Sequence, residues 1–375
     1  MDASSVRIAL VHDWLTGMRG GEKVLEALCE LYPHAELFTL LHVPGSISKT
    51  IERLPVHSSF IQHMPFARGL YRYYLPLFPL AIEQFDLDRF DLIVSTSHCA
   101  AKAVVKTGRA RHLCYCFTPM RYAWDQFDAY FGQDRFGHFR SQLMRYMMKL
   151  MRHWDASTSR RVDRYVAISQ YVADRINKYY DRTTTIIYPP VNTDFYFPDG
   201  RNPGNAFLVV SALVPYKRVD LAIESCRLAR VPLRIVGDGP ELNRLKKIAG
   251  PSVEFLGTVS DEKIRELYRE TAALLLPGEE DFGIVPVEAQ ACGRPVIALG
   301  RGGACETVIH GFNGLLVSRP TPEAFANSLK TLGEYSFDSI EIRKYALRFS
   351  RKRFITAIQA CVVETLETPK ETARW

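Results

Sequence analysis

Residues 274–291 read LLLPGEEDFGIVPVEAQA and predict a strand, a loop and a helix in succession. The apolar run at the start has the composition of a short buried strand, and Pro277-Gly278 ends it. Pro286 suits the first turn of the helix, because a backbone N–H has no intrahelical partner there in any case. A strand followed at once by a helix is the repeating unit of a parallel α/β sheet.

The same alternation extends over most of the chain in both directions. Short apolar runs predict strands at Arg7–Val11, Leu92–Ser95, Leu113–Cys116, Tyr165–Ile168, Thr185–Ile187, Phe207–Ser211, Leu233–Val236, Val253–Leu256, Ala273–Leu276, Val296–Leu299 and Leu315–Val317. Amphipathic stretches between them predict helices at Gly21–Leu31, Val219–Ala229, Glu241–Ala249, Asp261–Glu270 and Pro286–Ala291. We therefore expect the α/β class, with doubly wound parallel sheets.

The length of the chain and one segment rich in Pro and Gly predict two domains. A chain of 375 residues exceeds what one compact core normally supports. The segment from Tyr188 to Asn205 lacks periodicity, so we place a linker there. The expected domains are 1–190 and 205–344, each Rossmann-like, with the two sheets facing across a cleft that binds the ligands.

Glu280 and Glu288 lie on either side of a predicted anion site at the start of the helix after residue 283. Free backbone N–H groups and the positive end of the helix favour an anion such as a diphosphate there. The residues expected to contact it are Phe282, Gly283, Ile284 and Val285. A carboxylate beside such a site makes sense if it accepts hydrogen bonds from sugar hydroxyls.

The composition is that of an ordinary folded protein, with 47% hydrophobic and 24% charged residues. No apolar run is long enough to span a membrane, and residues 1–5 lack the features of a signal peptide, so we expect a cytoplasmic protein. The eight cysteines are scattered without a ligand set, and we expect no metal site. The net charge of +7 favours anionic partners, but it does not distinguish among nucleic acid, an anionic membrane and phosphorylated small molecules.

Residues 280–288 resemble the Glu-x7-Glu motif of a large family of retaining glycosyltransferases, the family 4-like group that includes sucrose synthase and many bacterial mannosyltransferases. Further landmarks of that family follow in the expected order, with YPPVN at 188–192, SALVPYK at 211–217, GDGP at 237–240, FLG at 255–257 and GGACE at 302–306. The resemblance covers nearly the whole chain. It implies the GT-B architecture, with a last helix at about 345–366 that returns to the N-terminal domain.

The resemblance also implies roles for single residues. Glu280 is expected to contact hydroxyls of a donor sugar and Glu288 the nucleotide ribose, without a metal ion or another cofactor. Lys217 follows a predicted strand, where its ammonium would stabilise the charge that grows on a departing diphosphate. The family usually has an arginine five residues earlier, where this chain has Ala212, and Arg218 is the candidate substitute.

A glycine loop follows the first predicted strand of the N-terminal half. Asp13 lies at the end of that strand, and Gly20 and Gly21 would let backbone approach a ligand closely. The loop is neither a P-loop nor a dinucleotide fingerprint, because the required spacings are missing. In the resembling family it lies beside the donor phosphates and the acceptor, so these three residues are candidate contacts. A turn-forming aspartate is an equally good interpretation of Asp13.

Residues 116–125, CFTPMRYAWD, resemble the His-Thr-Pro-x-Arg-Tyr-x-Trp-Asp signature of a bacterial mannosyltransferase-like branch. That branch has a histidine, which contacts the donor sugar, at the position of Phe117. His98 is a candidate for the nearby space, although a lone histidine is more often structural, and Arg121 is a candidate contact for an anionic acceptor. Residues 86–88 match the Asp-x-Asp of metal-dependent glycosyltransferases, but we interpret them as a loop.

Two stretches of the N-terminal half combine basic and aromatic side chains. One runs from Met64 to Phe78, and the other runs from Arg135 to Arg161, with Asp155 as its one acid. This pattern is typical of a helix that lies on an anionic bilayer, with an ordinary helix that has a solvated basic face as the alternative. We do not expect nucleic acid as a partner, because no recognition module accompanies the charge.

The prediction is a retaining hexosyltransferase that moves a hexose, best mannose from GDP-mannose, to a lipid-linked or polysaccharide precursor at the inner face of a bacterial membrane. Two alternatives stay open. A non-catalytic or regulatory GT-B protein that binds a nucleotide sugar is favoured by Phe117 and Ala212. A nucleotide-sugar epimerase or a phosphorylase would use the same architecture, although the sequence gives no signal for the pyridoxal-phosphate lysine of a phosphorylase.

Overall fold

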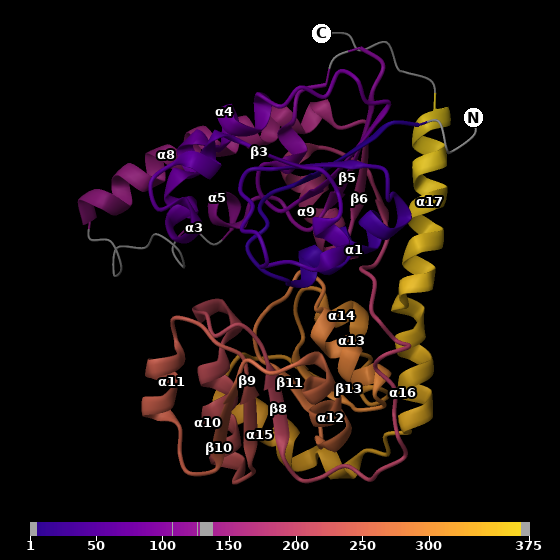
Figure 1. The fold of residues 1–375 in the computed structure, drawn as a ribbon. Helices are drawn as coiled ribbons and strands as arrows, with labels where there is room; N and C mark the ends of the chain where they lie inside the picture. The colour runs from indigo at the N-terminus through magenta and orange to yellow at the C-terminus, as the bar shows by residue number, and fades with distance from the viewer. Residues whose placement is uncertain (1–5, 107, 126, 128–137, 369–375) are drawn as a thin grey trace. The chain divides into compact units, whose positions relative to one another are not determined.

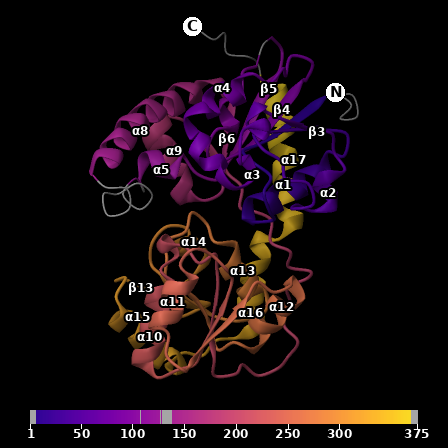
Figure 2. The ribbon, with the colours of Figure 1, turned by 60° about the vertical axis from the view of Figure 1, so that its left-hand side comes forward.

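The computed structural model describes residues 6–106, 108–125, 127 and 138–368. The chain divides into two compact units, unit 1 with residues 1–190 and 354–375, and unit 2 with residues 191–353. Each unit is built on one parallel sheet flanked by helices (Figures 1 and 2). The predicted α/β class with two Rossmann-like units is confirmed.

Unit 1 contains a seven-stranded parallel sheet of order β3-β2-β1-β4-β5-β6-β7. Its strands are β1 (Ile8–His12), β2 (Glu36–Thr39), β3 (Val56–Ser58), β4 (Leu92–Ser97), β5 (Arg111–Cys116), β6 (Arg164–Ala167) and β7 (Thr184–Ile186). The central strands β1, β4 and β5 are buried along almost their whole length, as expected for strands covered on both faces. The strand order reverses between β1 and β4, which makes their carboxyl ends the topological switch point.

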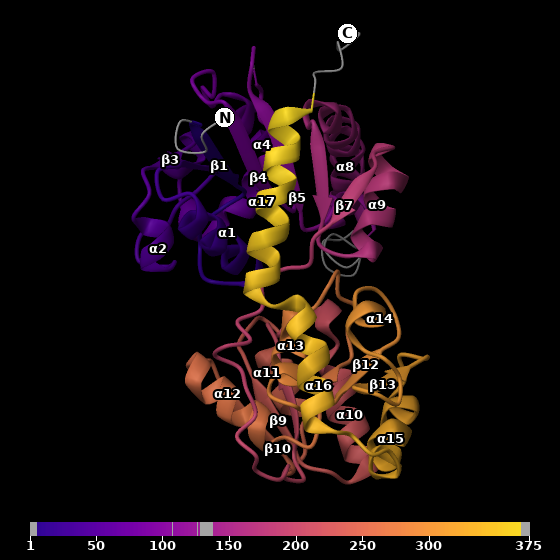
Figure 3. The same ribbon diagram turned by 90° about the vertical axis from the view of Figure 1, so that its right-hand side faces the viewer.

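The helices of unit 1 follow its strands in the usual alternation. They are α1 (Gly20–Leu31), α2 (Lys49–Glu52), α3 (Ala67–Leu70), α4 (Phe78–Glu83), α5 (Arg121–Trp124), α8 (His138–Thr158) and α9 (Gln170–Tyr180), with 3₁₀ turns η2 (Phe60–His63), η3 (Tyr71–Leu77), η4 (Ala101–Ala103) and η5 (Ser159–Arg161). The last helix, α17 (Arg351–Glu367), belongs to unit 1 from Phe354 onward (Figure 3). It buries Phe354, Ile358 and Cys361 at helical spacing, and Arg164 of β6 binds Glu364 at 2.5 Å.

Unit 2 contains a six-stranded parallel sheet of order β10-β9-β8-β11-β12-β13. Its strands are β8 (Phe207–Val210), β9 (Leu233–Val236), β10 (Val253–Gly257), β11 (Leu274–Leu276), β12 (Val296–Leu299) and β13 (Gly314–Val317). Its helices are α10 (Val219–Ala229), α11 (Leu242–Ile248), α12 (Asp261–Glu270), α13 (Ile284–Ala291), α14 (Ala304–Thr307), α15 (Pro322–Thr331) and α16 (Ser339–Ala346), with turns η6 (Pro215–Lys217), η7 (Leu332–Glu334) and η8 (Leu347–Phe349). The switch point lies between β8 and β11.

The observed elements and boundaries differ from the expected ones at several places. Strands β2 and β3 extend the sheet of unit 1 beyond the strands expected from the sequence. The helix expected at about 345–366 is α17, which begins later, at Arg351, because the turn η8 precedes it, and which ends at Glu367. The unit that contains the donor-site candidates comprises residues 191–353, whereas the sequence suggested 205–344. Within the described residues, no helix combines the length and the apolar character needed to cross a bilayer.

Candidate functional site

Lys217 and Glu280 meet at the switch point of unit 2. Lys217 ends the turn η6 after β8, and Glu280 lies in the loop after β11, the strand beside β8. Their loops emerge at one edge of the sheet because parallel strands end on the same side. The Nζ of Lys217 donates a hydrogen bond to Oε1 of Glu280, forming an ion pair. The two side chains are 20% and 13% exposed, so a ligand can still reach the pair from solvent.

Glycines allow the loops around this ion pair to approach closely. A Cβ on Gly278 would lie 2.9 Å from the Cα of Lys217. A Cβ on Gly303 would lie 2.3 Å from the Cα of Phe282, and the N–H of Gly303 donates to the carbonyl oxygen of Glu280 at 2.8 Å. Any larger residue at these two positions would push the loops apart. The loops after β8, β11 and β12 are therefore held against one another at fixed distances.

The helix α13 begins at Ile284, shortly after Glu280 in the chain. Its N-cap, Gly283, has a φ of 87°, a conformation that other residues rarely adopt, and contributes no side chain to the helix end. Gly283, Ile284 and Val285 are half-buried, so they stay candidate contacts for the predicted anion. Phe282 differs, because its ring is buried and lies 5.5 Å from the ring of Phe349. Phe282 could meet a ligand only through its backbone.

Glu288 is held in place by Tyr268, a residue that sequence reasoning did not select. Glu288 is buried in α13, and its Oε2 accepts a hydrogen bond of 3.0 Å from the hydroxyl of Tyr268 in α12. Burial raises the pKa of the Tyr268 phenol well above its usual value, and the charge of Glu288 adds to this. The phenol therefore stays protonated and fixes the orientation of the carboxylate. A single sequence cannot distinguish such a tyrosine from one that only fills the core.

Arg218 and Ala212 leave the expected second phosphate contact open. Arg218 follows Lys217 with a φ of 53°, and this left-handed backbone turns the chain into α10. Its guanidinium donates to the carboxylate of Asp220 at 3.2 and 3.3 Å. A phosphate contact through Arg218 would have to compete with Asp220.

Asp13 lies at the switch point of unit 1 and is completely buried. Its carboxylate accepts backbone hydrogen bonds from His98, Cys99, Ala100 and Ala101 at 2.7, 3.0, 2.6 and 2.7 Å. Burial alone would raise the pKa of this carboxyl, but the charge and hydrogen bonds of His98 outweigh it and lower the pKa to about 2. In this arrangement Asp13 fixes the loop after β4, and its buried carboxylate offers no free surface to an acceptor.

His98 is the exposed member of this pair. Its Nδ1 lies 3.0 Å from Oδ2 of Asp13, and its side chain is 32% exposed. Trp14 holds the ring from the side, with the two ring centroids 4.5 Å apart and nearly perpendicular. An imidazole tied through Nδ1 to a carboxylate presents Nε2 outward, where it can exchange hydrogen bonds with a hydroxyl.

Phe117 lies beside His98 and the glycine loop. Its ring is 6.3 Å from the His98 ring and 6.4 Å from the ring of the buried His12. A Cβ on Gly21 would approach the Phe117 ring to 3.3 Å, so the start of α1 covers the ring closely. Gly20 is the first residue of that helix. The structure thus brings Asp13, Gly21, His98 and Phe117 together at the carboxyl ends of β1, β4 and β5.

Two buried residues beside this cluster were not singled out from the sequence. The Nδ1 of His12 lies 2.7 Å from Oγ1 of Thr96, and its Nε2 lies 3.9 Å from Glu22. Burial raises the pKa of the Glu22 carboxyl, whereas the neighbouring His12 lowers it, and the net effect is a lowered pKa. In the sequence, His12 directly precedes Asp13 and Glu22 follows Gly21. This proximity to two candidate residues was the only sign in the sequence that His12 and Glu22 lie beside the site.

The 116–125 stretch has a partly structural role. Trp124 donates to the buried Asp155 at 2.7 Å, and Asp125 forms an ion pair with Arg175. Arg121 begins α5 and is half-buried, so it stays a candidate contact without a defined ligand-facing position. The Asp-x-Asp stretch is a loop, in which Asp86 accepts the N–H of Asp88 at 3.1 Å. Over the described residues, no cluster of His, Cys, Asp or Glu is arranged to hold a metal ion.

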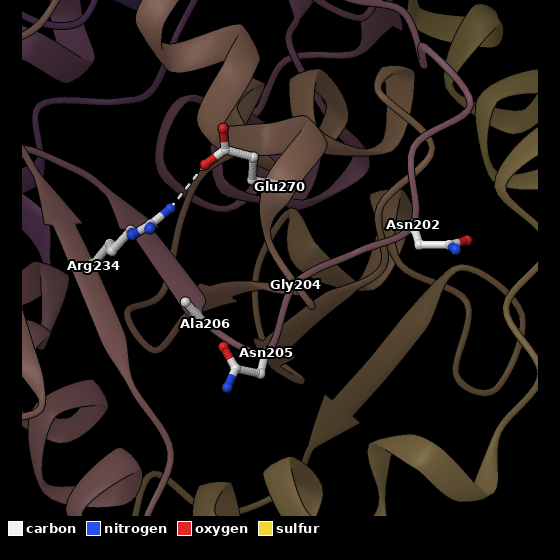
Figure 4. Close-up of a pocket in the computed structure, with 6 residues that line it drawn as sticks. All are labelled: Asn202, Gly204, Asn205, Ala206, Arg234 and Glu270. Atoms are coloured by element: carbon white, nitrogen blue, oxygen red, sulfur yellow. Dashed lines mark hydrogen bonds and ion pairs between the residues drawn. The ribbon is translucent and has the colours of Figure 1, made fainter.

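A surface pocket lies on the other side of unit 2, at the amino ends of the strands of its sheet (Figure 4). It is lined by Asn202, Gly204, Asn205, Ala206, Arg234 and Glu270. Ala206 directly precedes β8, so the pocket is at the amino end of that strand and away from Lys217 and Glu280. Arg234 and Glu270 bind each other at 2.9 Å, so this pocket adds no unpaired charge to the candidate site.

Two family models match consecutive parts of the chain. Residues 18–195 match Glycosyltransferase Family 4, and residues 196–348 match Glycosyl transferases group 1. The chain belongs to the family 4-like glycosyltransferases of the GT-B type. The boundary between the two matches lies close to the boundary between units 1 and 2 at residue 190.

Relatives with known names agree with this family. An uncharacterized glycosyltransferase of Methanocaldococcus jannaschii is 27% identical over 212 residues, which cover 52% of this chain and 58% of that protein. A D-inositol 3-phosphate glycosyltransferase of Streptomyces griseus is 28% identical over 215 residues, 44% of this chain and 45% of that protein. The chain thus matches about half the length of these curated relatives.

The fold of this glycosyltransferase-family chain is shared with solved structures. Anabaena HepE, in a complex with UDP and glucose, gives a TM-score of 0.71 at 20% sequence identity. The similarity covers 96% of this chain and 99% of HepE. At this identity the similarity establishes the two-unit fold.

Proposed function

We propose that this protein transfers a hexose from a nucleoside diphosphate sugar to an acceptor hydroxyl, with retention of the anomeric configuration. The observation that carries the proposal is the Lys217–Glu280 pair at the switch point of unit 2, beside the start of α13. A cation, a carboxylate and free backbone N–H groups are the partners that a diphosphate joined to a sugar requires. Unit 2 would be the donor side and unit 1 the acceptor side.

In the proposed reaction, the bond from the anomeric carbon to the diphosphate oxygen breaks as the acceptor oxygen bonds to the same face of that carbon. The acceptor proton passes to the departing phosphate. Lys217 stabilises the charge that grows on this phosphate, which lowers the barrier more than it strengthens ground-state binding. Glu280 accepts hydrogen bonds from the sugar hydroxyls, and Glu288, held by Tyr268, accepts them from the ribose.

On the acceptor side, we assign the direct contact to His98. Its Nδ1 is bound to Asp13, so Nε2 is the ring atom available to an acceptor hydroxyl. Asp13 then acts as a positioning residue for His98 and its loop. Gly20, Gly21 and Arg121 remain candidates for contacts with the donor phosphates or with an anionic acceptor.

The first candidate donor is GDP-mannose, and UDP-hexoses are the alternative. The sequence signature at residues 116–125 supports the mannosyl donor. The HepE structures, which contain UDP, UDP with glucose or UDP-glucose, support the alternative. The candidate acceptor is a lipid-linked or polysaccharide precursor. Thermal shifts with GDP and with UDP would separate the two bases, because a ligand at about 100 times its dissociation constant adds about 2.7 kcal/mol of stability.

The test of the activity is turnover of GDP-mannose and UDP-glucose by the wild-type protein and by Glu280→Gln and Lys217→Met. We expect both variants to lose at least about 100-fold in kcat, as for removal of one group that stabilises the transition state. Glu254→Gln, on β10 with a side chain that is 60% exposed, is the matched control and should keep full activity. Equal turnover by Glu280→Gln and the wild-type protein would overturn the proposal.

A non-catalytic nucleotide-sugar protein is the second candidate, because Phe117 replaces the family histidine beside His98. This candidate predicts that a nucleotide sugar binds but is neither hydrolysed nor transferred. It also predicts that Phe117→His creates activity where the wild-type protein has none. In the same assay, an epimerase would convert the nucleotide sugar into a different nucleotide sugar even when no acceptor is present.

A further inference from the structure

Helix α8 has apolar side chains on its outer face as well as on its inner face. Met148 and Met151 are buried in the hydrophobic cluster of unit 1. On the other side, Leu143, Tyr146 and Leu150 are 55%, 61% and 51% exposed and follow one another at spacings of three and four residues. Residues with this spacing form one stripe along a helix. A single exposed leucine is ordinary, whereas a stripe of three large apolar side chains indicates a binding surface.

Basic side chains accompany this stripe, and acidic ones do not. Lys149 and His153 are exposed on the same helix. The one acid between residues 138 and 160 is Asp155, which is fully buried and bound to Lys102 at 3.0 Å. The outer face of α8 therefore carries positive charge and apolar surface together. Figure 2 shows the helix along the outside of unit 1.

A second stretch of unit 1 has the same character. Phe66 and Tyr73 are 82% and 72% exposed, and no Asp or Glu occurs from residue 60 to residue 82. Arg68 and Arg72 are exposed between them. Phe66 has a φ of 53°, an unfavourable conformation for a bulky residue, so the backbone is strained where its ring points into solvent.

The two stretches are joined through the core of unit 1. Tyr71, Leu75 and Phe78 belong to the same hydrophobic cluster as Met148 and Met151 of α8. Both stretches therefore pack their inner sides on the same cluster and present their exposed apolar and basic side chains outward. We call them the lipid-facing surface, which consists of Phe66, Arg68, Leu70, Arg72, Tyr73, Leu143, Tyr146, Lys149, Leu150 and His153.

We propose that the lipid-facing surface binds an anionic lipid bilayer. Apolar side chains flanked by Lys and Arg match the interface of such a bilayer, where the rings and leucines enter the headgroup region and the cations meet lipid phosphates. In this proposal the lipid-facing surface rests in the headgroup region, with the rest of unit 1 outside the bilayer. The inference deepens the proposed function by locating the side of unit 1 that would meet a lipid-linked acceptor.

The test is co-sedimentation of the full chain with vesicles of phosphatidylcholine alone and of phosphatidylcholine mixed with phosphatidylglycerol. We expect binding to the mixed vesicles, weakened by added salt. The double variant Arg68→Glu, Lys149→Glu should bind at least about 30-fold more weakly, because each basic side chain near an anionic surface contributes several-fold. The variant Leu143→Glu, Leu150→Glu should also lose binding. Both pairs are exposed, so the fold should remain intact, and circular dichroism verifies this.

Matched controls lie in unit 2. Arg319→Glu with Lys330→Glu changes the net charge equally at exposed positions, and Ile340→Glu replaces an apolar side chain that is 64% exposed. Neither control should change vesicle binding. Equal weakening in variants and controls, or no wild-type binding to mixed vesicles, would overturn the proposal. So would a concentration-dependent dimer that Leu143→Glu abolishes, because a second copy would then cover the surface.

Vesicle binding is measured without any sugar donor, so the proposed lipid contact can be refuted while the proposed glycosyl transfer is not. Measuring the binding of GDP or UDP to the surface variants distinguishes the two proposals. Retained nucleotide binding with lost vesicle binding supports the lipid-facing surface. Intact vesicle binding in Glu280→Gln, together with lost turnover, assigns the two roles to different residues.

Discussion

The carboxylate of Asp13 offers a sharp test of how unit 1 is held together at its switch point. Replacing it by asparagine keeps the size of the side chain but substitutes an NH2 group for one oxygen. Of the four backbone N–H groups that now donate to Asp13, two would then face another donor. Each buried polar group left without a partner costs about 1–3 kcal/mol. We therefore expect Asp13→Asn to lower the free energy of unfolding of unit 1 by about 2–6 kcal/mol.

The pKa of Asp13 leads to a similar value. A fall from 3.8 in the unfolded chain to about 2 in the folded chain corresponds to about 2–3 kcal/mol of stability at neutral pH. Because the folded pKa is lowered, this contribution is fully present above the unfolded value. It is lost as the pH falls from about 4 to about 2. The asparagine variant should lack this part of the acid dependence.

Urea unfolding followed by tryptophan fluorescence measures the effect, because the tryptophans of the described residues, Trp14, Trp124 and Trp154, belong to unit 1. Asp91→Asn is the matched control, since its ion pair with Arg7 joins side chains that are 42% and 63% exposed. Exposed pairs contribute at most about 1 kcal/mol. A cost for Asp13→Asn no larger than that of the control, or an unchanged acid transition, would refute the assignment of Asp13 as a positioning residue.

Two further variants test other contacts. Gly303→Ala would bring a Cβ to 2.3 Å from the Cα of Phe282, so we expect nucleotide affinity, measured by calorimetry, to fall by up to about 100-fold. Gly333→Ala is the control, because its Cβ would have no heavy atom within 4 Å, and it should leave the affinity unchanged. Equal affinities in the two variants would contradict the close loop contact. Lys102→Met leaves the buried carboxylate of Asp155 without its cation, and should cost about 3–5 kcal/mol in urea unfolding. A loss below about 1 kcal/mol would show that the hydrogen bonds to Asp155 from other residues suffice.

The sheet of unit 2 was predictable because four of its strands, β8, β11, β12 and β13, are continuous apolar runs. Val296–Leu299, for example, is buried at every position, and its observed bounds equal the predicted ones. The two strands missing from the prediction lie toward the edge of the other sheet. Strand β3 is Val-His-Ser with two exposed residues, so its place depends on pairing with β2 and not on its own composition. Pairing between distant segments leaves little trace in so short a stretch.

The candidate site was predictable in its residue types but not in its contacts. The spacing of Glu280 and Glu288 follows from one loop and one helix, which the sequence shows directly. The contact of Glu280 with Lys217 joins residues 63 positions apart and requires the strand order of the sheet. The role of Asp13 depends on where the N–H groups of the loop after β4 point, and the sequence carries no information on backbone N–H directions. A turn-forming aspartate and a ligand contact were therefore equally good interpretations.

The ion pair between Lys217 and Glu280 sets up a competition for one ammonium group. In the proposed function, a diphosphate and the carboxylate of Glu280 would both bind the Nζ of Lys217, so the nucleotide would have to displace a partner that belongs to the protein itself. With a sugar attached, Glu280 would gain hydroxyls in exchange for the ammonium. Once the sugar had moved to the acceptor, Glu280 would have no such replacement and would bind Lys217 again. The pair would thus weaken product inhibition by the free nucleoside diphosphate, and Glu280→Gln should bind GDP or UDP more tightly even as it transfers less sugar.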